Sequence, residues 1–276
     1  VERWDGQGDG RIQGWFELRE FLTCTQDLFK AFAKLSEQYG TRIHTHLAEG
    51  TYEVDYCIGK YGRRLAQRLE DIGFMSPRVH CAHSVFLSDD ELDVYARNDV
   101  SVAHCPSCNF VFMGAPKIPQ MRRQGIRVGI GSDGSAFGSL DLFQEMNISW
   151  AGQCLSLGTP YHHWPLTDYR DVWRMATIDS ARALGWDDEI GSLEVGKRAD
   201  LIILDMDSLT VMPVQGDLLF AVARRMNGNS VLTVMVDGQV LMKDRELTTI
   251  DEDWLKAEIR ERVPPIMERY LAGVPG

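Results

Sequence analysis

Residues 126–133 read IRVGIGSD, a strand-like run with almost no polar residue until its end, and this run decides the fold class. Four other strand-like stretches precede it, at residues 11–18, 42–47, 78–83 and 100–104. Short runs of β-branched, aromatic and other apolar residues are typical of strands. Helix-forming stretches separate them, so strand and helix alternate from residue 11 to residue 184. This alternation predicts an α/β fold with a parallel sheet and crossover helices.

Amphipathic periodicity predicts the helices of this α/β part. In the first helix four apolar side chains share one face, and Gly40 stands where it would end the helix. Ser88 and Glu91 fit a capping box that opens a later helix. The predicted helices cover residues 25–40, 61–72, 88–97, 115–124, 140–157 and 168–184.

The pattern changes after Trp186 and becomes richer in strands. Residues 199–205 (ADLIILD) and 231–242 are predicted strands, the latter a hairpin around Asp237 and Gly238. A final helix is expected over residues 251–270, interrupted at Pro264 and Pro265. We therefore expect an α/β part at residues 1–185 and a smaller β-rich part at residues 186–276.

Composition excludes several classes of protein. The 276 residues carry 29 Lys and Arg against 40 Asp and Glu, a net charge of −11 that disfavours binding to nucleic acid. No apolar run approaches the roughly 20 residues that span a bilayer, and the first residues do not resemble a signal peptide. Six irregularly spaced cysteines are unlike a disulfide framework, which favours a reducing, cytoplasmic location.

Histidines and carboxylates cluster at the predicted carboxyl ends of the strands. Five of the seven histidines of the chain belong to this set. Ligands of parallel α/β folds bind beyond the carboxyl ends of the strands. Imidazoles and carboxylates that converge there suit a zinc or ferrous ion that activates water. The set is His44, His46, Glu49, His80, His83, His104 and Asp133.

Four strand motifs resemble those of the amidohydrolase superfamily: HTHLAE (44–49), VHCAH (79–83), SVAHCPSCN (101–109) and VGIGSDG (128–134). More narrowly they are similar to its amino- and chlorohydrolases of nitrogen heterocycles, such as guanine, cytosine and S-adenosylhomocysteine deaminases and s-triazine hydrolases. Residues 191–205 (GSLEVGKRADLIILD) resemble the segment that leads from the barrel of that family into its small β-sandwich. The resemblance implies a TIM-like (β/α)8 barrel, of which this chain holds strands 4 to 8, plus a small β-sandwich part and a C-terminal helix.

The resemblance also implies roles for individual residues. His46 matches the metal ligand of strand 5, and Glu49 matches the carboxylate that shuttles protons and contacts a substrate ring nitrogen. His80 matches the strand-6 histidine that polarises the attacking water or the substrate. Asp133 matches the strand-8 aspartate, which touches the metal and acts as a base. One divalent metal is implied, zinc in the first place and iron as the alternative.

Arg19 departs from part of the family. It lies in the predicted strand-4 loop, where S-adenosylhomocysteine deaminases have a histidine and guanine deaminases an arginine. A guanidinium there would grip a ring carbonyl or a carboxylate of the substrate, which favours an oxo-bearing heterocycle. The alternative is a surface ion pair with Glu17 or Glu20.

The remaining polar residues near these motifs receive lesser roles. His44 and His83 match no family role, and His44 is expected one level deeper than His46 on the same side of its strand. Asn109 is expected to be a structural or pocket residue. The loop that starts at His104 and Cys105 is expected to border the pocket, and His162 and His163 to lie on a surface loop.

Two other site classes are rejected. Cytidine-deaminase-like enzymes use H-x-E followed by P-C-x-x-C, whereas this chain has H-x-x-E and a proline inside the pair Cys105 and Cys108. A single C-x-x-C is weak evidence for a structural zinc site because a second pair is missing. The stretch GIGSDG lacks the G-K-[ST] ending of a phosphate-binding loop.

The resemblance implies an enzyme that hydrolytically deaminates a cyclic nitrogen heterocycle of purine, pterin, pyrimidine or triazine type. The alternative reaction is hydrolytic dechlorination of an s-triazine-like ring. The expected partners are the small heterocycle and either a second copy in a homodimer or a second fragment that supplies strands 1 to 3.

The family's strand-1 H-x-H pair, which supplies two more metal ligands, is missing from the sequence. Three accounts are open. The chain is the C-terminal part of a deaminase of roughly 450 residues, or a non-catalytic remnant that binds through the same cleft, or a short enzyme with altered metal ligation.

Overall fold

Five parallel strands form one sheet in the order β1-β2-β3-β4-β5 in the computed structural model, which describes residues 1–135, 138, 140–162, 167–214 and 216–273. Every neighbouring pair of strands runs parallel, so the α/β fold with a parallel sheet is confirmed. All five lie within the predicted stretches but are shorter. They are β1 (Phe16–Leu18), β2 (Ile43–Leu47), β3 (Val79–His83), β4 (Ser101–His104) and β5 (Arg127–Ile130).

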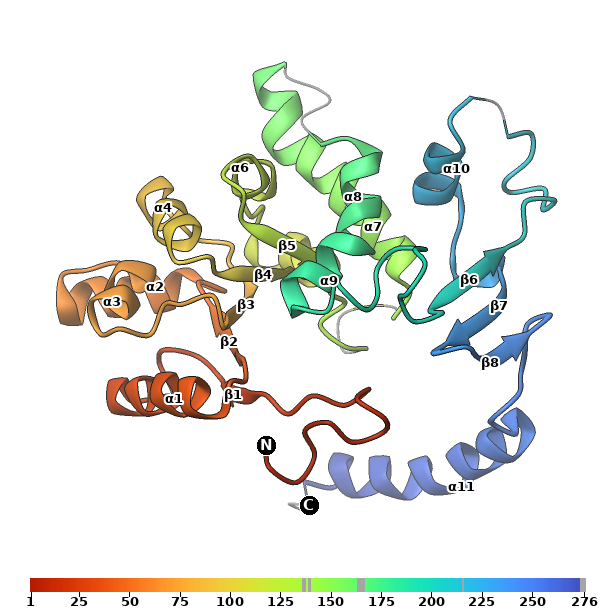
Figure 1. Cartoon of the computed structure of the whole chain (residues 1–276), viewed down its shortest axis with the longest axis horizontal. Helices are drawn as coiled ribbons and strands as arrows, with labels where there is room; N and C mark the ends of the chain where they lie inside the picture. Colours follow the sequence, from red (N-terminus) through yellow and green to blue (C-terminus); the bar gives the residue numbers. More distant parts are fainter. Residues whose placement is uncertain (136–137, 139, 163–166, 215, 274–276) are drawn as a thin grey trace.

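Helices connect successive strands, and Figure 1 shows α1, α3, α4 and α6 ranged along one side of the curved sheet. The first helix begins after the N-cap Thr25, ends at Gly40 and matches its prediction. The predicted capping box of Ser88 and Glu91 is also confirmed. The helices of this part are α1 (Gln26–Tyr39), α2 (Thr51–Tyr61), α3 (Leu65–Asp71), α4 (Asp89–Arg97), α5 (Pro106–Cys108), α6 (Ile118–Arg123), α7 (Leu142–Gln153), α8 (Tyr169–Met175) and α9 (Ile178–Leu184).

Several helix boundaries differ from the predictions. Helix α2 was not expected, and it ends because Gly62 adopts a left-handed conformation, so the next helix begins only at Leu65. The loop after β4 contains α5 and the π-helix Asn109–Met113, which carry no periodic pattern long enough to be seen. The predicted helix 168–184 is two helices, which are separated at Ala176 and Thr177.

The C-terminal part contains a four-stranded antiparallel sheet in the order β6-β7-β8-β9. Its strands are β6 (Leu201–Leu204), β7 (Val231–Val236), β8 (Gln239–Lys243) and β9 (Glu246–Leu247), and the predicted hairpin around Asp237 and Gly238 is confirmed. Helix α10 (Leu218–Arg225) was not predicted. The domain boundary between residues 185 and 186 stays a prediction. Within the described residues, no helix is both long and apolar enough to cross a membrane.

The last helix, α11 (Glu252–Leu271), runs through Pro264 and Pro265, so the predicted interruption is wrong. None of its described residues is buried. The two prolines therefore disturb no packed neighbour of this helix.

Alternation along β2 separates the core from the site. Ile43, Thr45 and Leu47 are fully buried, whereas His44 and His46 point to the other face and are only partly covered. The buried face packs against the surrounding helices, where Phe29 of α1 meets Phe74 edge to face at 4.9 Å between ring centroids. The other face is left for polar side chains.

A row of polar residues crosses that second face in register. Glu17 lies opposite His44, His44 opposite His80, and His80 opposite Ser101. The Nδ1 atom of His80 is 2.9 Å from the Ser101 hydroxyl, and Trp15 contacts the imidazole edge on at 5.8 Å. Burial lowers the pKa of His80 to about 3, so its ring is neutral at ordinary pH.

Helix α9 covers this face beside β4 and β5. The Ser101 hydroxyl donates to the backbone oxygen of Ala183 at 3.0 Å. Gly129 of β5 permits the close approach, because a Cβ atom there would lie 3.0 Å from the backbone of Ser180. The lower part of the face is therefore packed, and the open part lies toward the carboxyl ends of the strands.

Glu91 anchors the chain that follows β3. Its buried carboxylate accepts hydrogen bonds from the Arg64 side chain at 2.6 Å and from the backbone of Ser88 at 2.9 Å and Ala66 at 3.0 Å. One side chain thus caps both α3 and α4 and holds the segment between His83 and α4.

Glu91→Ala is expected to lower the free energy of unfolding by about 3 kcal/mol, because it leaves Arg64 and two buried N–H groups without their acceptor. Urea unfolding monitored by circular dichroism measures the change. Asp90→Ala, an exposed neighbour on the same helix turn, is the matched control and should change stability by less than about 0.5 kcal/mol. Equal effects of the two substitutions would contradict the role given to Glu91.

His80 should make the protein sensitive to acid. Its pKa in the folded protein lies below the ordinary 6.5, so the unfolded chain binds the proton first. The contribution of neutral His80 to the free energy of unfolding is complete above pH 6.5. It falls by about 1.4 kcal/mol per pH unit as the pH falls toward 3. His80→Asn should reduce this slope in urea unfolding between pH 6 and pH 5, whereas His162→Gln, at an exposed position, should leave it unchanged. An unchanged slope in His80→Asn would refute the buried neutral state.

Candidate active site

Three side chains converge at the carboxyl end of the parallel sheet. His46 comes from β2, His83 from the end of β3, and Asp133 from the loop after β5. One ligand atom of each lies within 4.8 Å of the others, so the three could hold a metal ion. His46 and Asp133 were predicted as metal ligands, whereas His83 matched no family role.

Each of these strand ends has a non-glycine residue with a left-handed backbone. The φ angles are +53° at Ala48, +68° at His83, +55° at Ser84 and +58° at Asp133. Such conformations cost about 1–3 kcal/mol each and persist only where the surroundings impose them. Their coincidence at three strand ends of one face supports a functional site there.

His46 is held neutral. Burial lowers its pKa to about 4, and the nearby Arg19 and His83 act in the same direction. Neutral imidazole is the form that binds a metal. Its Nδ1 atom has no hydrogen-bond partner within the described part of the chain.

Glu49 lies between His83 and Arg19. One carboxylate oxygen is 3.8 Å from His83 Nε2, and the other is 3.5 Å from an Arg19 guanidinium nitrogen. Only 7% of the residue is exposed. The carboxylate is therefore almost fully withdrawn from water and faces both a ring nitrogen and a cation.

Arg19 points toward the site. Of the two alternatives, the observed ion pair is with Glu49, while Glu17 and Glu20 make no salt bridge to it within the described ranges. About half of the Arg19 side chain is exposed, so the guanidinium can reach a bound molecule.

Glu53 is a buried residue that the sequence analysis missed. Its carboxyl oxygen accepts the backbone N–H of Glu49 at 3.2 Å, and it lies in the first turn of α2, four residues after Glu49. Burial raises the pKa of Glu53 to about 8. The spacing of four residues from Glu49 is the only sequence signal for this contact.

His80 does not join the group formed by His46, His83 and Asp133. It lies in the row below, beside His44 at 5.5 Å between ring centroids and bonded to Ser101. His44 itself forms a second group with Glu17 and His46, whose possible ligand atoms also lie within 4.8 Å of one another.

The loop after β4 borders the site, as expected. The Asn109 side-chain amide lies 3.0 Å from His83 Nδ1, and both residues are fully buried. Burial lowers the pKa of His104 to about 3 and raises that of the Cys105 thiol to about 12. His162 is exposed, and His163 lies outside the described residues.

The donor set fits a divalent metal. Two imidazoles and a carboxylate are typical zinc ligands, and catalytic zinc sites use three protein ligands with one position open. His83 Nε2 and Glu49 Oε2 are buried without hydrogen-bond partners among the described residues, as expected of atoms that face a missing group. Zinc binds imidazole nitrogens well, whereas magnesium and calcium prefer oxygen ligands, so this donor set favours zinc over magnesium or calcium.

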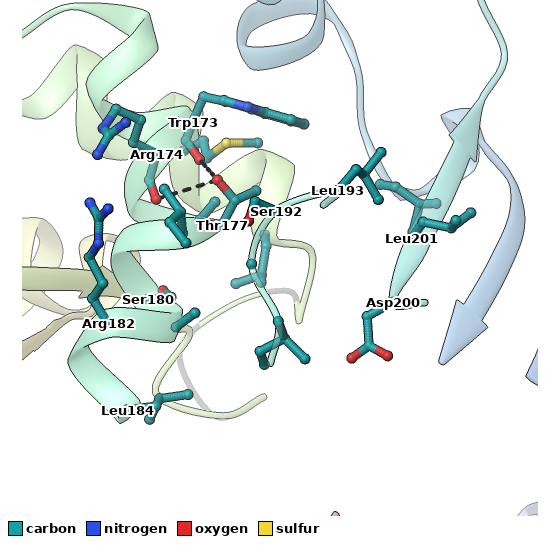
Figure 2. Close-up of a pocket in the computed structure, with 18 of the residues that line it drawn as sticks. Trp173, Arg174, Thr177, Ser180, Arg182, Leu184, Ser192, Leu193, Asp200 and Leu201 are labelled. Carbon is teal, nitrogen blue, oxygen red and sulfur yellow. Dashed lines mark hydrogen bonds between the residues drawn. The ribbon is translucent and has the colours of Figure 1, made fainter. Parts of the chain in front are cut away.

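A separate apolar cavity of about 900 Å³ lies between helices α7 to α9 and the segment that leads into β6. Figure 2 shows Trp173, Leu193 and Leu201 around it, with the Thr177 hydroxyl bonded to the backbone of Trp173 at 2.9 Å. The cavity contains none of the predicted site residues. It is therefore a second concave surface and not the candidate active site.

Comparison with curated proteins finds deaminases. The chain is 35% identical over 269 residues to a 5'-deoxyadenosine deaminase of Methanobrevibacter smithii, which covers 97% of this chain and 61% of that protein. It is 33% identical over 275 residues to a 5-methylthioadenosine/S-adenosylhomocysteine deaminase of Caldanaerobacter subterraneus, which covers 98% and 61%. The chain thus spans about three-fifths of the length of the curated relatives it matches.

Solved structures of related proteins have the same fold as this chain. A zinc-bound adenosine deaminase of Xanthomonas campestris superimposes with a TM-score of 0.88 at 28% identity, covering 95% of this chain and 59% of that one. The atrazine chlorohydrolase TrzN of Arthrobacter aurescens, also with zinc, gives a TM-score of 0.83 at 25% identity and covers 96% and 58%. A model of the amidohydrolase family matches residues 1–241. The chain therefore belongs to the amidohydrolase family.

Proposed function

We propose that this chain carries the proton-transfer residues and part of the metal site of an aminohydrolase that deaminates a nitrogen heterocycle. The observation that carries the proposal is the convergence of His46, His83 and Asp133 beside the buried carboxylate of Glu49. The deaminases among its relatives support the same reaction.

We assign metal binding to His46 and Asp133, with zinc as the ion and iron as the alternative. Zinc-bound structural neighbours support this choice. When bound, zinc supplies Lewis-acid chemistry that lowers the pKa of water from about 16 toward about 7.

Two side chains carry the proton steps. Asp133 accepts a proton from the attacking water, and Glu49 delivers a proton to the ring nitrogen next to the attacked carbon. The water oxygen forms the new bond to that carbon. The bond from carbon to the amino nitrogen then breaks, the amino group leaves as ammonia with the proton that Asp133 took from the water, and Glu49 recovers a proton from the new hydroxyl as the carbonyl forms. Glu49 is suited to this shuttle because it is withdrawn from water and lies 3.8 Å from His83 in the candidate site.

We propose that His83, in place of His80, is the strand-end histidine that faces the reacting atoms. His83 lies 3.8 Å from Glu49, whereas His80 is bonded to Ser101 in the row below. Arg19 is assigned to a polar group of the substrate, and its half-exposed guanidinium supports this role.

The substrate class follows from the relatives. Adenosine-type nucleosides are acted on by the matched deaminases, and an s-triazine by the structural neighbour TrzN. Deamination and dechlorination both replace a leaving group on an amidine-like carbon, so ammonia or halide release across purine, pterin and triazine compounds decides between them.

We further propose that a closed (β/α)8 barrel completes the site, with β1 as strand 4 and β5 as strand 8. Within the described residues, β1 and β5 each have one strand neighbour, so both outer edges are free to pair. A polypeptide segment that supplies strands 1 to 3 would pair with these edges. The apolar cavity of Figure 2 is a further surface against which that segment would pack. A homodimer and a cytoplasmic location also stay proposals, the latter supported by six free cysteines.

Asp133→Asn in the complete enzyme is expected to reduce deamination at least about 1000-fold, because the amide neither accepts the proton nor binds the metal as an anion. Ammonia release from an adenosine-type substrate measures the loss. Asp253→Asn on the exposed helix α11 is the control and should retain full activity. Activity near that of the wild type in Asp133→Asn would refute the assignment of the metal site.

Intact-mass spectrometry combined with metal analysis by ICP-MS tests whether the site is complete in the purified protein. We expect about one zinc for each active site, together with the mass of the polypeptide that supplies the remaining strands. A 31.2 kDa species without stoichiometric metal would instead favour the non-catalytic binding role.

A further inference from the structure

Three hydrogen bonds hold Asn109 in place, apart from its contact with His83. Its backbone N–H donates to Cys105 at 2.9 Å, and its backbone oxygen accepts from Gly114 at 2.7 Å. Its side-chain oxygen accepts the backbone N–H of Cys105 at 3.3 Å. Asn109 therefore has little freedom to turn, and it is fully buried.

The orientation of the Asn109 amide follows from these contacts. The backbone N–H of Cys105 is a donor only, so the amide oxygen must face it and the amide NH2 group faces His83. The reverse orientation would place two donors against each other. At 3.0 Å, the NH2 group donates to His83 Nδ1, which must then be the nitrogen that carries no proton.

A neutral imidazole with an unprotonated Nδ1 carries its proton on Nε2. That atom points to the site: it lies 3.8 Å from the Glu49 carboxylate and has no hydrogen-bond partner among the described residues. A nitrogen that bears a proton has no lone pair to offer a metal.

We propose that Asn109 is a positioning residue that holds His83 as the Nε2–H tautomer, so that His83 donates toward the reacting atoms and does not bind the metal. The inference rests on the proposed function for the identity of the reacting atoms. Of the three residues that could hold a metal ion, the inference keeps His46 and Asp133 as metal ligands and excludes His83, although His83 is close enough to be a third.

Nuclear magnetic resonance of protein labelled with 15N-histidine tests the tautomer directly, without reference to activity. His83→Gln assigns the signals by their disappearance. At neutral pH we expect a His83 spectrum with a protonated Nε2 and an unprotonated Nδ1, and we expect it to persist when zinc is added. A protonated Nδ1 in the wild-type protein, or His83 signals that shift as a zinc ligand, would overturn the inference.

Asn109→Asp is the sharpest variant, because a carboxylate accepts a hydrogen bond where the amide donated one. We expect the His83 tautomer to invert to Nδ1–H, kcat to fall about 100-fold, and KM to change less than about 3-fold. An unchanged tautomer in a folded variant would count against the proposal. If this variant does not fold, Asn109→Ala should leave His83 as a mixture of both tautomers, and an unmixed Nε2–H spectrum would refute the role of Asn109.

Ser101→Ala is the matched control, since it removes the corresponding hydrogen bond from His80 and should leave the His83 signals unchanged. The role of Asn109 and the proposed function can each be refuted without the other. A protein without zinc or deaminase activity, but with the expected tautomer and its inversion, refutes the function and keeps the role of Asn109. Zinc-dependent deamination with His83 as a ligand refutes the role of Asn109 and keeps the function.

Discussion

Strands that are hydrogen-bonded in parallel all end at the same edge of their sheet, and the candidate site depends on this constraint. Register aligns the inward-facing residues in rows: His46 lies opposite Ala82, Ala82 opposite Ala103, and Ala103 opposite Gly129. The small side chains of this row leave room around the His46 imidazole. The row below it is filled by larger polar side chains, and α9 packs against it beside β4 and β5.

Burial then determines the charge state of the imidazoles at this edge. Withdrawal from water lowers the pKa of His46 and His83, and both rings stay neutral where a metal or a proton donor is required. Glu49 and Asp133 oppose this effect at His83, because a carboxylate favours the protonated ring. The hydrogen bond from Asn109 acts on a different property, since it selects which ring nitrogen carries the single proton. Desolvation therefore disfavours the charged ring, and the hydrogen bond from Asn109 both favours the neutral ring and fixes its tautomer.

Alternation of strand and helix was enough to predict the parallel sheet, and the rule of carboxyl ends was enough to bring His46 and Asp133 together. The same rule also collected His83, but the strand-6 role went to His80, which was matched to the family motif. Alternation along β3 places residues 80 and 82 on one face and residue 83 on the other, so alternation alone would turn His83 away from the site. His83 reaches the site only because the strand ends in two successive left-handed residues, His83 and Ser84, which turn its side chain. Neither residue is a glycine, so the sequence carries no signal for that turn.

Under the proposed assignment, the number of metal ligands is linked to closure of the barrel. His46 and Asp133 are two ligands, and a catalytic zinc site requires at least three from protein. His46 lies on β2 and Asp133 follows β5 in the same curved sheet, and among the described residues β1 and β5 are its outer strands. A further ligand on a strand paired to either edge would end at the same carboxyl rim, because parallel pairing extends the rim with each strand added. If the barrel closes as proposed, the same added strands would complete the metal site, and their loss would remove both together.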